Sequence, residues 1–242
     1  ITAIYKAMEQ MGFKEGNLLE PSCGIGNFIG MLPDTMQDSK IYGVELDTIS
    51  AGIAQQLYQK TTIAAQGFEE TNLPDSFFDL AIGNVPFGQY QVTDRQYVQA
   101  ALSKFTITFL AKNRRINSRV GGIMAFITTS GTMDKKSESV RRYLAARCDL
   151  IGAVRLPNNT FTAQAGTTVT SDILFLQKRG RILEQDAPWI HLGETADGIS
   201  AEPVFHRPSR DDLRRDADGQ RPLRAAPHLR AAGKWYITRR SA

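Results

Sequence analysis

Seven short apolar runs alternate with longer amphipathic stretches over the first 180 residues of the chain. The runs are rich in Val, Ile, Leu and Phe and lack polar alternation, which is typical of strands covered on both faces. Strand–helix alternation at this spacing predicts an α/β fold, with a mostly parallel sheet and helices on both sides. The predicted strands are residues 17–22, 41–47, 61–66, 78–84, 122–128, 150–156 and 172–177. The predicted helices are residues 2–11, 26–32, 48–60, about 95–113 and 138–147.

Composition excludes several classes of protein. No apolar run approaches the roughly 20 residues that a membrane-spanning helix needs, so we expect a cytoplasmic protein with no membrane partner. Cys23 and Cys148 are the two cysteines of the chain, and their spacing predicts neither a disulfide framework nor a zinc site. The three histidines all follow residue 190, which excludes histidine acid–base chemistry and a histidine metal site from the part before it.

Charge is distributed unevenly along the chain. Residues 1–90 have a net charge of −7, residues 91–180 of +9 and residues 181–242 of +2. The basic side chains of the middle part include Lys112, Arg114, Arg115, Arg119, Lys135, Lys136, Arg141 and Arg142. Such a stretch suits a polyanionic partner, but a set of solvated helix faces has the same composition, and the sequence leaves both open.

The organisation changes near residue 180. We expect one catalytic domain over residues 1–180 and a C-terminal extension over residues 181–242. Residues 188–193 still look folded because Trp189, Ile190 and Leu192 are bulky and apolar. From about residue 201 the chain is rich in Arg, Ala, Pro and Asp, so we expect this part to be partly disordered. The chain begins at Ile1 without a Met, and we expect a segment of a longer protein.

A Gly-x-Gly turn between the first strand and the next helix is the first chemical motif. Gly24 and Gly26 lack a Cβ, which permits a sharp turn and a close approach to a nucleotide. The second strand ends in Glu45-Leu46-Asp47, about 20 residues on, where a carboxylate can accept both ribose hydroxyls. Together these features predict an adenosine-containing cofactor, either NAD or S-adenosylmethionine.

The end of the fourth strand favours S-adenosylmethionine. Asn84-Val85-Pro86-Phe87 follows this strand, at the sheet edge where ligands bind in open α/β folds. The side chain of Asn84 and the main chain near Val85 and Pro86 offer two carbonyl acceptors for the N–H groups of an exocyclic amine, while Phe87 stacks on its ring. Such positioning directs the nitrogen lone pair at a methyl donor without a general base. An ordinary strand-ending turn has a similar composition.

These motifs, in this order, resemble the S-adenosylmethionine-dependent DNA adenine-N6 methyltransferases. The likeness is greatest to modification subunits of type I restriction systems and to methylase–helicase fusions of phages and conjugative elements. It runs over residues 1–178 and implies a Rossmann-like seven-stranded methyltransferase fold with a reversed last strand. The matching segments are LLEPSCGIGNF, YGVELD, FFDLAIGNVPFGQY, VGGIMAFIT, LIGAVRLP and TSDILFL.

The resemblance also implies roles for particular residues. It places the ribose at Glu45, beside Asp47 of the same strand end. From its position next to the turn, we further expect Glu20 to contact the ammonium of the cofactor's amino-acid part. Phe68 would pack on the cofactor's adenine, with Glu69 as a substitute for the acid that relatives carry at Gln66. Asn84, Val85, Pro86 and Phe87 match the catalytic Asn-Pro-Pro-Tyr/Phe motif, with Val85 in place of the first proline. Phe161 matches an aromatic that packs on the target base. The segment along the cofactor backbone is Pro21, Ser22, Cys23, Gly24 and Gly26.

The sequence differs from the family in two respects, and several alternative functions remain open. Relatives have a Tyr-Thr-Pro-type segment just before the first helix, and this sequence begins at Ile1, inside or after that point. We also expect no target-recognition region, unless the short C-terminal tail serves as one. Base readout would then come from a specificity domain or subunit, or from a helicase fusion, with this chain binding DNA phosphates. The alternative functions are a protein glutamine N5-methyltransferase and a module that binds S-adenosylmethionine or DNA with little activity. An NAD-dependent dehydrogenase is the least favoured because no hydride-transfer site is evident.

Overall fold

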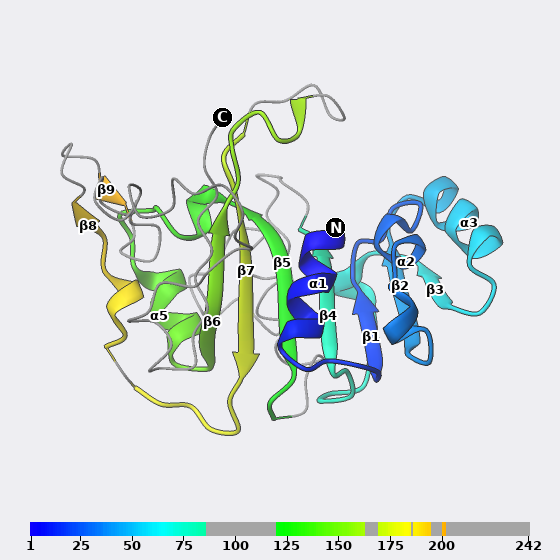
Figure 1. The fold of residues 1–242 in the computed structure, drawn as a ribbon, viewed down its shortest axis with the longest axis horizontal. Coiled ribbons are helices and arrows are strands. Elements are labelled where there is room, and N and C mark those ends of the chain that lie inside the picture. Colours follow the sequence, from blue (N-terminus) through cyan, green and yellow to red (C-terminus); the bar gives the residue numbers. More distant parts are fainter. Residues whose placement is uncertain (86–119, 163–168, 185, 195–199, 202–242) are drawn as a thin grey trace, which may run out of the picture. The chain divides into compact units, whose positions relative to one another are not determined.

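The computed structural model describes residues 1–85, 120–162, 169–184, 186–194 and 200–201. Its described strands include one seven-stranded sheet, with the order β3-β2-β1-β4-β5-β7-β6 (Figure 1). The strands of this sheet are β1 (Asn17–Glu20), β2 (Lys40–Glu45), β3 (Thr62–Ala65), β4 (Leu80–Asn84), β5 (Ile123–Thr129), β6 (Cys148–Arg155) and β7 (Ser171–Lys178). All seven predicted strands are confirmed. A short antiparallel pair is formed by β8 (Gly193–Glu194) and β9 (Ser200–Ala201).

The described helices match the prediction in position but are shorter. They are α1 (Thr2–Gln10), α2 (Asn27–Gly30), α3 (Thr48–Leu57) and α5 (Ser139–Ala145), with 3-10 turns at Asp34–Met36, Phe68–Glu70, Ser130–Thr132 and Pro188–Ile190. The helix predicted near residues 95–113 and the tail after residue 201 lie outside the described residues. None of the described helices is long and apolar enough to cross a bilayer.

The chain folds into two compact units. Of the described residues, those within 1–128 and 177–180 form the first unit, and those within 129–176 and 181–201 form the second. The first unit contains both the glycine turn and the strand end at Asn84. Whether a domain boundary falls at residue 180 stays a prediction.

Parallel pairing within the first unit brings the predicted site residues to one sheet edge. Strand β1 pairs in parallel with β2 and β4, with Leu19 opposite Tyr42 on one side and Ala81 on the other. The core strand residues Leu18, Leu19, Leu80, Ala81 and Ile82 are at most 1% exposed. Since neighbouring parallel strands end at the same edge, the segments that follow β1, β2 and β4 emerge together.

Strand β7 runs against its neighbours, as the predicted reversed strand should. In the first unit, the Gly121 N–H donates to the Lys178 carbonyl and the Lys178 N–H donates to the Gly122 carbonyl. The end of β7 therefore lies at the beginning of β5. In the second unit, the Leu156 N–H donates to the Ser171 carbonyl, which places the beginning of β7 at the end of β6. The sheet is accordingly mixed.

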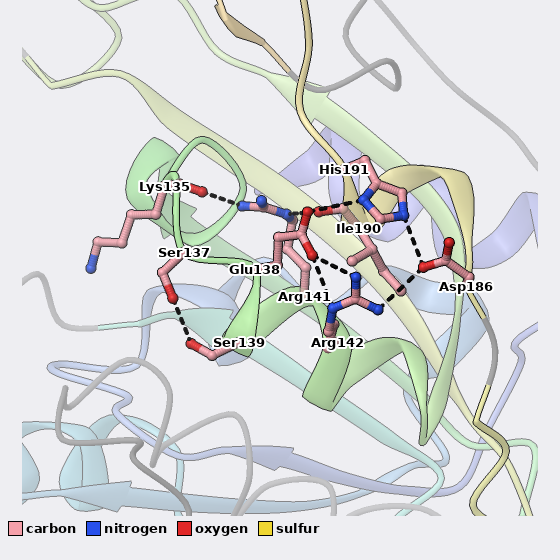
Figure 2. A network of polar contacts seen from close by, with 9 residues as sticks. All are labelled: Lys135, Ser137, Glu138, Ser139, Arg141, Arg142, Asp186, Ile190 and His191. Carbon is pink, nitrogen blue, oxygen red and sulfur yellow. Dashed lines mark hydrogen bonds and ion pairs between the residues drawn. The ribbon is translucent and has the colours of Figure 1, made fainter.

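Arg141 and Arg142, which the sequence suggested as parts of a basic surface, form hydrogen bonds and ion pairs within the second unit. Arg141 is fully buried, and its guanidinium donates to the main-chain carbonyls of Met133, Lys135 and Ile190. Arg142 bonds the carboxylates of Glu138 and Asp186 (Figure 2). The interpretation of Arg141 as part of a basic surface is thus wrong, because its guanidinium is buried and donates to main-chain carbonyls inside the fold.

A histidine completes this polar network. The ring of His191 lies between Glu138 and Asp186, with Nδ1 2.9 Å from Glu138 Oε1 and Nε2 2.8 Å from Asp186 Oδ1 (Figure 2). The hydrogen bond to Asp186, and after it the hydrogen bond to Glu138, raises the pKa of the imidazole above its ordinary value. The network links the segment around the Pro188–Ile190 turn to the beginning of α5.

Candidate active site at the ends of β1, β2 and β4

The turn after β1 has the left-handed backbone that its glycines allow. Gly24 has a φ of +55° and Gly26 a φ of +86°, a region that other L-residues rarely adopt. The Cys23 N–H donates to the Val44 carbonyl, and the Gly26 N–H closes the turn on the Cys23 carbonyl. Cys23 is buried, and this burial raises the pKa of its thiol to about 12, so the thiol stays protonated and unreactive.

The two glycines serve different purposes. Among the described residues, a Cβ at Gly24 would meet no atom within 4 Å, so its missing side chain leaves open space there. A Cβ at Gly26 would lie 2.4 Å from Cε2 of Tyr58, whose hydroxyl also occupies the side-chain position of Gly30. Gly26 is therefore required for packing under the Tyr58 ring, while the position of Gly24 is compatible with a ligand. The sequence had predicted the same role for both glycines, namely a sharp turn close to a nucleotide.

Glu45 connects the end of β2 to the glycine turn. One carboxylate oxygen accepts the N–H of Gly24 at 2.7 Å, and the other accepts the N–H of Asp47 at 2.9 Å. Asp47 is the N-cap of α3, where its carboxylate accepts the N–H of Ser50 at 2.8 Å and has a lowered pKa. The predicted ribose acid thus also fixes the turn, and the second predicted acid starts a helix.

Glu20, the last residue of β1, is a buried acid with an unsatisfied atom. Its side chain is 2% exposed, and its Oε2 has no hydrogen-bond partner among the described residues. Burial raises the pKa of this carboxyl well above its usual value, the negative charge of Glu45 raises it further, and the main-chain N–H of Ile29 opposes the shift. A carboxyl in this state favours either a proton or a cationic partner.

The end of β4 contacts the turn directly. The hydroxyl of Ser22 donates to the main-chain oxygen of Asn84 at 2.8 Å. On the preceding residue of β4, a Cβ at Gly83 would lie 3.6 Å from Cγ of Glu20 and 3.8 Å from Cδ of Pro21. The predicted neighbourhood of the glycine turn and the Asn84 strand end is confirmed by these contacts. Pro86 and Phe87 lie outside the described residues.

The remaining predicted residues lie in two places. Phe68 is 6% exposed in the turn after β3, and Glu69 follows it with an exposed side chain whose carboxylate folds back over Gly67. Phe161 is half-buried and belongs to the second unit. Among the described residues, the structure contains no group of three or more potential metal ligands.

Sequence reasoning missed Leu46. Its side chain is 71% exposed, although it is apolar and lies between Glu45 and Asp47. An exposed leucine beside Glu45, the predicted ribose acid, offers an apolar wall, but a single exposed apolar residue is common on protein surfaces. The signal in the sequence was the apolar residue within the Glu-Leu-Asp segment, which only its exposure distinguishes from a core residue.

The strand order, the reversed strand and the glycine turn define a Rossmann-like fold of the S-adenosylmethionine-dependent methyltransferase class. The chain is similar to a modification subunit of a putative type I restriction enzyme from Vibrio vulnificus YJ016. The TM-score is 0.63 at 16% identity, over 98% of this chain and 57% of that one. The predicted resemblance to type I modification subunits is therefore confirmed for the fold.

Two relatives are similar in sequence, and no family model matches the chain. The chain is 28% identical over 210 residues to the defense against restriction protein B of Escherichia phage P1, covering 84% of this chain and 9% of that protein. It is 40% identical over 80 residues to the type II methyltransferase M.CvrRI of Paramecium bursaria Chlorella virus XZ-6E, covering 33% of this chain and 21% of that protein. The matched regions are thus a small part of both relatives.

Proposed function

We propose that this chain transfers a methyl group from S-adenosylmethionine to the N6 amine of an adenine in DNA. The observation that carries the proposal is the Ser22–Asn84 hydrogen bond, because it joins the turn suited to a cofactor to the strand end suited to an amine. The similarity to a type II methyltransferase supports the same reaction class.

The residues of the turn fit the amino-acid part of the cofactor. Glu20, whose buried Oε2 has no hydrogen-bond partner among the described residues, would hold the ammonium group of S-adenosylmethionine. The carboxyl would release its proton to solvent, and the carboxylate would then be paired with the ammonium instead of being buried as an isolated charge. The open space at Gly24 allows the ligand to approach the main chain.

Glu45 and its neighbours fit the adenosine part. Each carboxylate oxygen of Glu45 accepts one main-chain N–H, and a carboxylate has about four acceptor positions, so two remain for ribose hydroxyls. Phe68 and Leu46 supply apolar surface after β3 and β2 for the adenine ring. Asp47 and Glu69 add polar groups at the same sheet edge.

Asn84 and Val85 orient the amine of the target base. The Asn84 side chain is exposed at the end of β4, and its amide oxygen accepts one N–H of the amine, while the main chain near Val85 and Pro86 accepts the other. The cofactor supplies an electrophilic methyl group on a sulfonium sulfur. The protein contributes position and hydrogen-bond acceptors, and the family resemblance assigns stacking on the flipped base to Phe87 and Phe161.

DNA and a specificity domain or subunit are the proposed partners. Duplex DNA buries the adenine amine, so the base must be extruded and its sequence context recognised by a larger surface. The net charge of +9 over residues 91–180 suits phosphate contacts, although Arg141 and Arg142 are engaged within the fold. Base readout then belongs to another part of the assembly.

Replacement of Asn84 by Ala tests the proposal. We expect methyl transfer from labelled S-adenosylmethionine to adenine-rich DNA to fall about a hundredfold or more, with cofactor affinity retained. Gln56→Ala removes an exposed amide on α3 and serves as the matched control. Unchanged transfer in Asn84→Ala, or transfer to a glutamine peptide in place of DNA, contradicts the proposal. Cofactor binding without any transfer favours a binding module.

A further inference from the structure

The hydroxyl of Ser22 donates a hydrogen bond to the main-chain oxygen of Asn84, at the end of β4 where we propose catalysis. Ser22 follows Pro21 directly after β1, and its Oγ lies 2.8 Å from the carbonyl oxygen of Asn84. A serine hydroxyl has a single hydrogen, which this bond uses. The contact joins residues 62 positions apart in the sequence.

The other side of the same peptide unit is also held. The N–H of Val85, which shares a peptide plane with the Asn84 carbonyl, donates to the Ile127 carbonyl on β5 at 3.0 Å. The Val85 side chain is completely buried. The peptide between Asn84 and Val85 is thus fixed at its oxygen by Ser22 and at its nitrogen by Ile127.

This clamp controls the two acceptors that the proposed function requires. The Asn84 side chain leaves the chain just before the clamped peptide, and the Val85 carbonyl lies just after it. Rotation of that peptide would redirect both groups. Misplacement of a reacting group by about 1 Å can reduce a rate a hundredfold. A single hydrogen bond that orients this peptide can therefore affect the rate of methyl transfer strongly.

We propose that Ser22 is a positioning residue, which sets the direction of the Asn84 and Val85 acceptors from within the cofactor turn. The inference rests on the proposed function, and it changes the role that the family resemblance gave to Ser22. A residue that only lined the cofactor would affect cofactor affinity. A residue that orients the acceptors affects the rate of transfer once the cofactor is bound.

Ser22→Ala and Ser22→Thr separate these roles. In Ser22→Ala we expect the single-turnover rate of methyl transfer to fall about tenfold or more, while the dissociation constant of S-adenosylmethionine changes less than about twofold. Ser22→Thr retains a hydroxyl and restores most of the rate. Thr61→Val is the matched control, because it removes a hydroxyl-to-carbonyl bond of 2.6 Å to Tyr58, away from the β4 end.

Amide hydrogen exchange at Val85 tests the clamp independently of activity. We expect the Val85 N–H to exchange about fivefold to tenfold faster in Ser22→Ala than in the parent chain or Thr61→Val. If the parent chain transfers no methyl group, the proposed function fails, but this exchange still decides whether Ser22 holds the peptide. Unchanged Val85 exchange, or a loss of transfer explained entirely by weaker cofactor binding, overturns the inference.

Discussion

The N–H of Gly24 donates a 2.7 Å hydrogen bond to the carboxylate of Glu45, so the turn after β1 is held by the last residue of β2. The same carboxylate accepts the N–H of Asp47. One acidic side chain therefore organises the segments that follow two neighbouring strands. This relationship makes Glu45 both a structural residue and a candidate ligand, and the two roles can be separated by experiment.

Glu45→Ala should lower stability and cofactor affinity together. Loss of the charged acceptor removes hydrogen bonds from two main-chain N–H groups, which we expect to cost about 1–2 kcal/mol of unfolding free energy. Binding of S-adenosylmethionine, measured by calorimetry, should weaken tenfold or more. Glu45→Gln keeps one oxygen and should be intermediate. Glu70→Ala, at an exposed position, provides the control, and an unaltered affinity in Glu45→Ala would exclude it as a ligand.

The two glycines of the turn should respond differently to a methyl group. Gly24→Ala meets open space, so only its left-handed backbone contributes, at about 1–2 kcal/mol. Gly26→Ala also collides with the Tyr58 ring and should cost about 1–3 kcal/mol more. Urea unfolding measures both. Combining Gly26→Ala with Tyr58→Ala should recover part of the collision energy, and equal costs at the two glycines would contradict the packing account.

Glu20 should make the unliganded protein less stable as pH rises. The folded state raises the pKa of this carboxyl, so between its unfolded pKa and its folded pKa the unfolded chain ionises while the folded chain keeps its proton. Stability is therefore fully present below about pH 4.3 and declines above it, by at most about 1.4 kcal/mol per pH unit.

Glu20→Gln removes this pH dependence. We expect the variant to gain stability relative to the parent as pH increases, and to bind S-adenosylmethionine more weakly because the ammonium loses its anionic partner. Thermal unfolding from pH 4 to pH 8 gives the first quantity and calorimetry the second. Glu15→Gln, at an exposed side chain, should reproduce the parent profile. A pH profile shared by Glu20→Gln and the parent would show that Glu20 is not buried in its neutral form.

The contacts of His191 with Asp186 and Glu138 should weaken as pH rises, because the imidazole loses its proton. Asp186 and Glu138 raise the pKa of the imidazole, so the charged ring stabilises the folded segment at low pH and this contribution is lost as pH passes the folded pKa. An NMR titration of the ring should give a midpoint above 6.5, and Asp186→Asn should lower it. A midpoint at or below 6.5 in the parent chain would contradict the geometry in Figure 2.

The sequence determined the architecture because strand and helix periodicity are local properties. The runs that contain Leu18–Leu19 and Leu80–Ala81–Ile82 are continuous and apolar, and such runs are stable only when both faces of a strand are covered. The chain order of the motifs then placed Gly24, Glu45 and Asn84 at strand ends. Since parallel strands end at a common edge, the sequence by itself predicted their proximity.

The tertiary structure alone decided which side chains pack together and which polar atoms pair in hydrogen bonds. Helix α2 contains only four residues, and the Tyr58 ring packs where side chains of Gly26 and Gly30 would lie. Arg141 is buried although arginine usually lies at the surface, because three carbonyls accept its hydrogen bonds, two from the segment Met133–Lys135 and one from Ile190. The Ser22–Asn84 bond and the unpartnered oxygen of Glu20 likewise depend on groups far apart in the sequence. Local patterns carry no information about such long-range pairings, since these are fixed only when the packed chain excludes water.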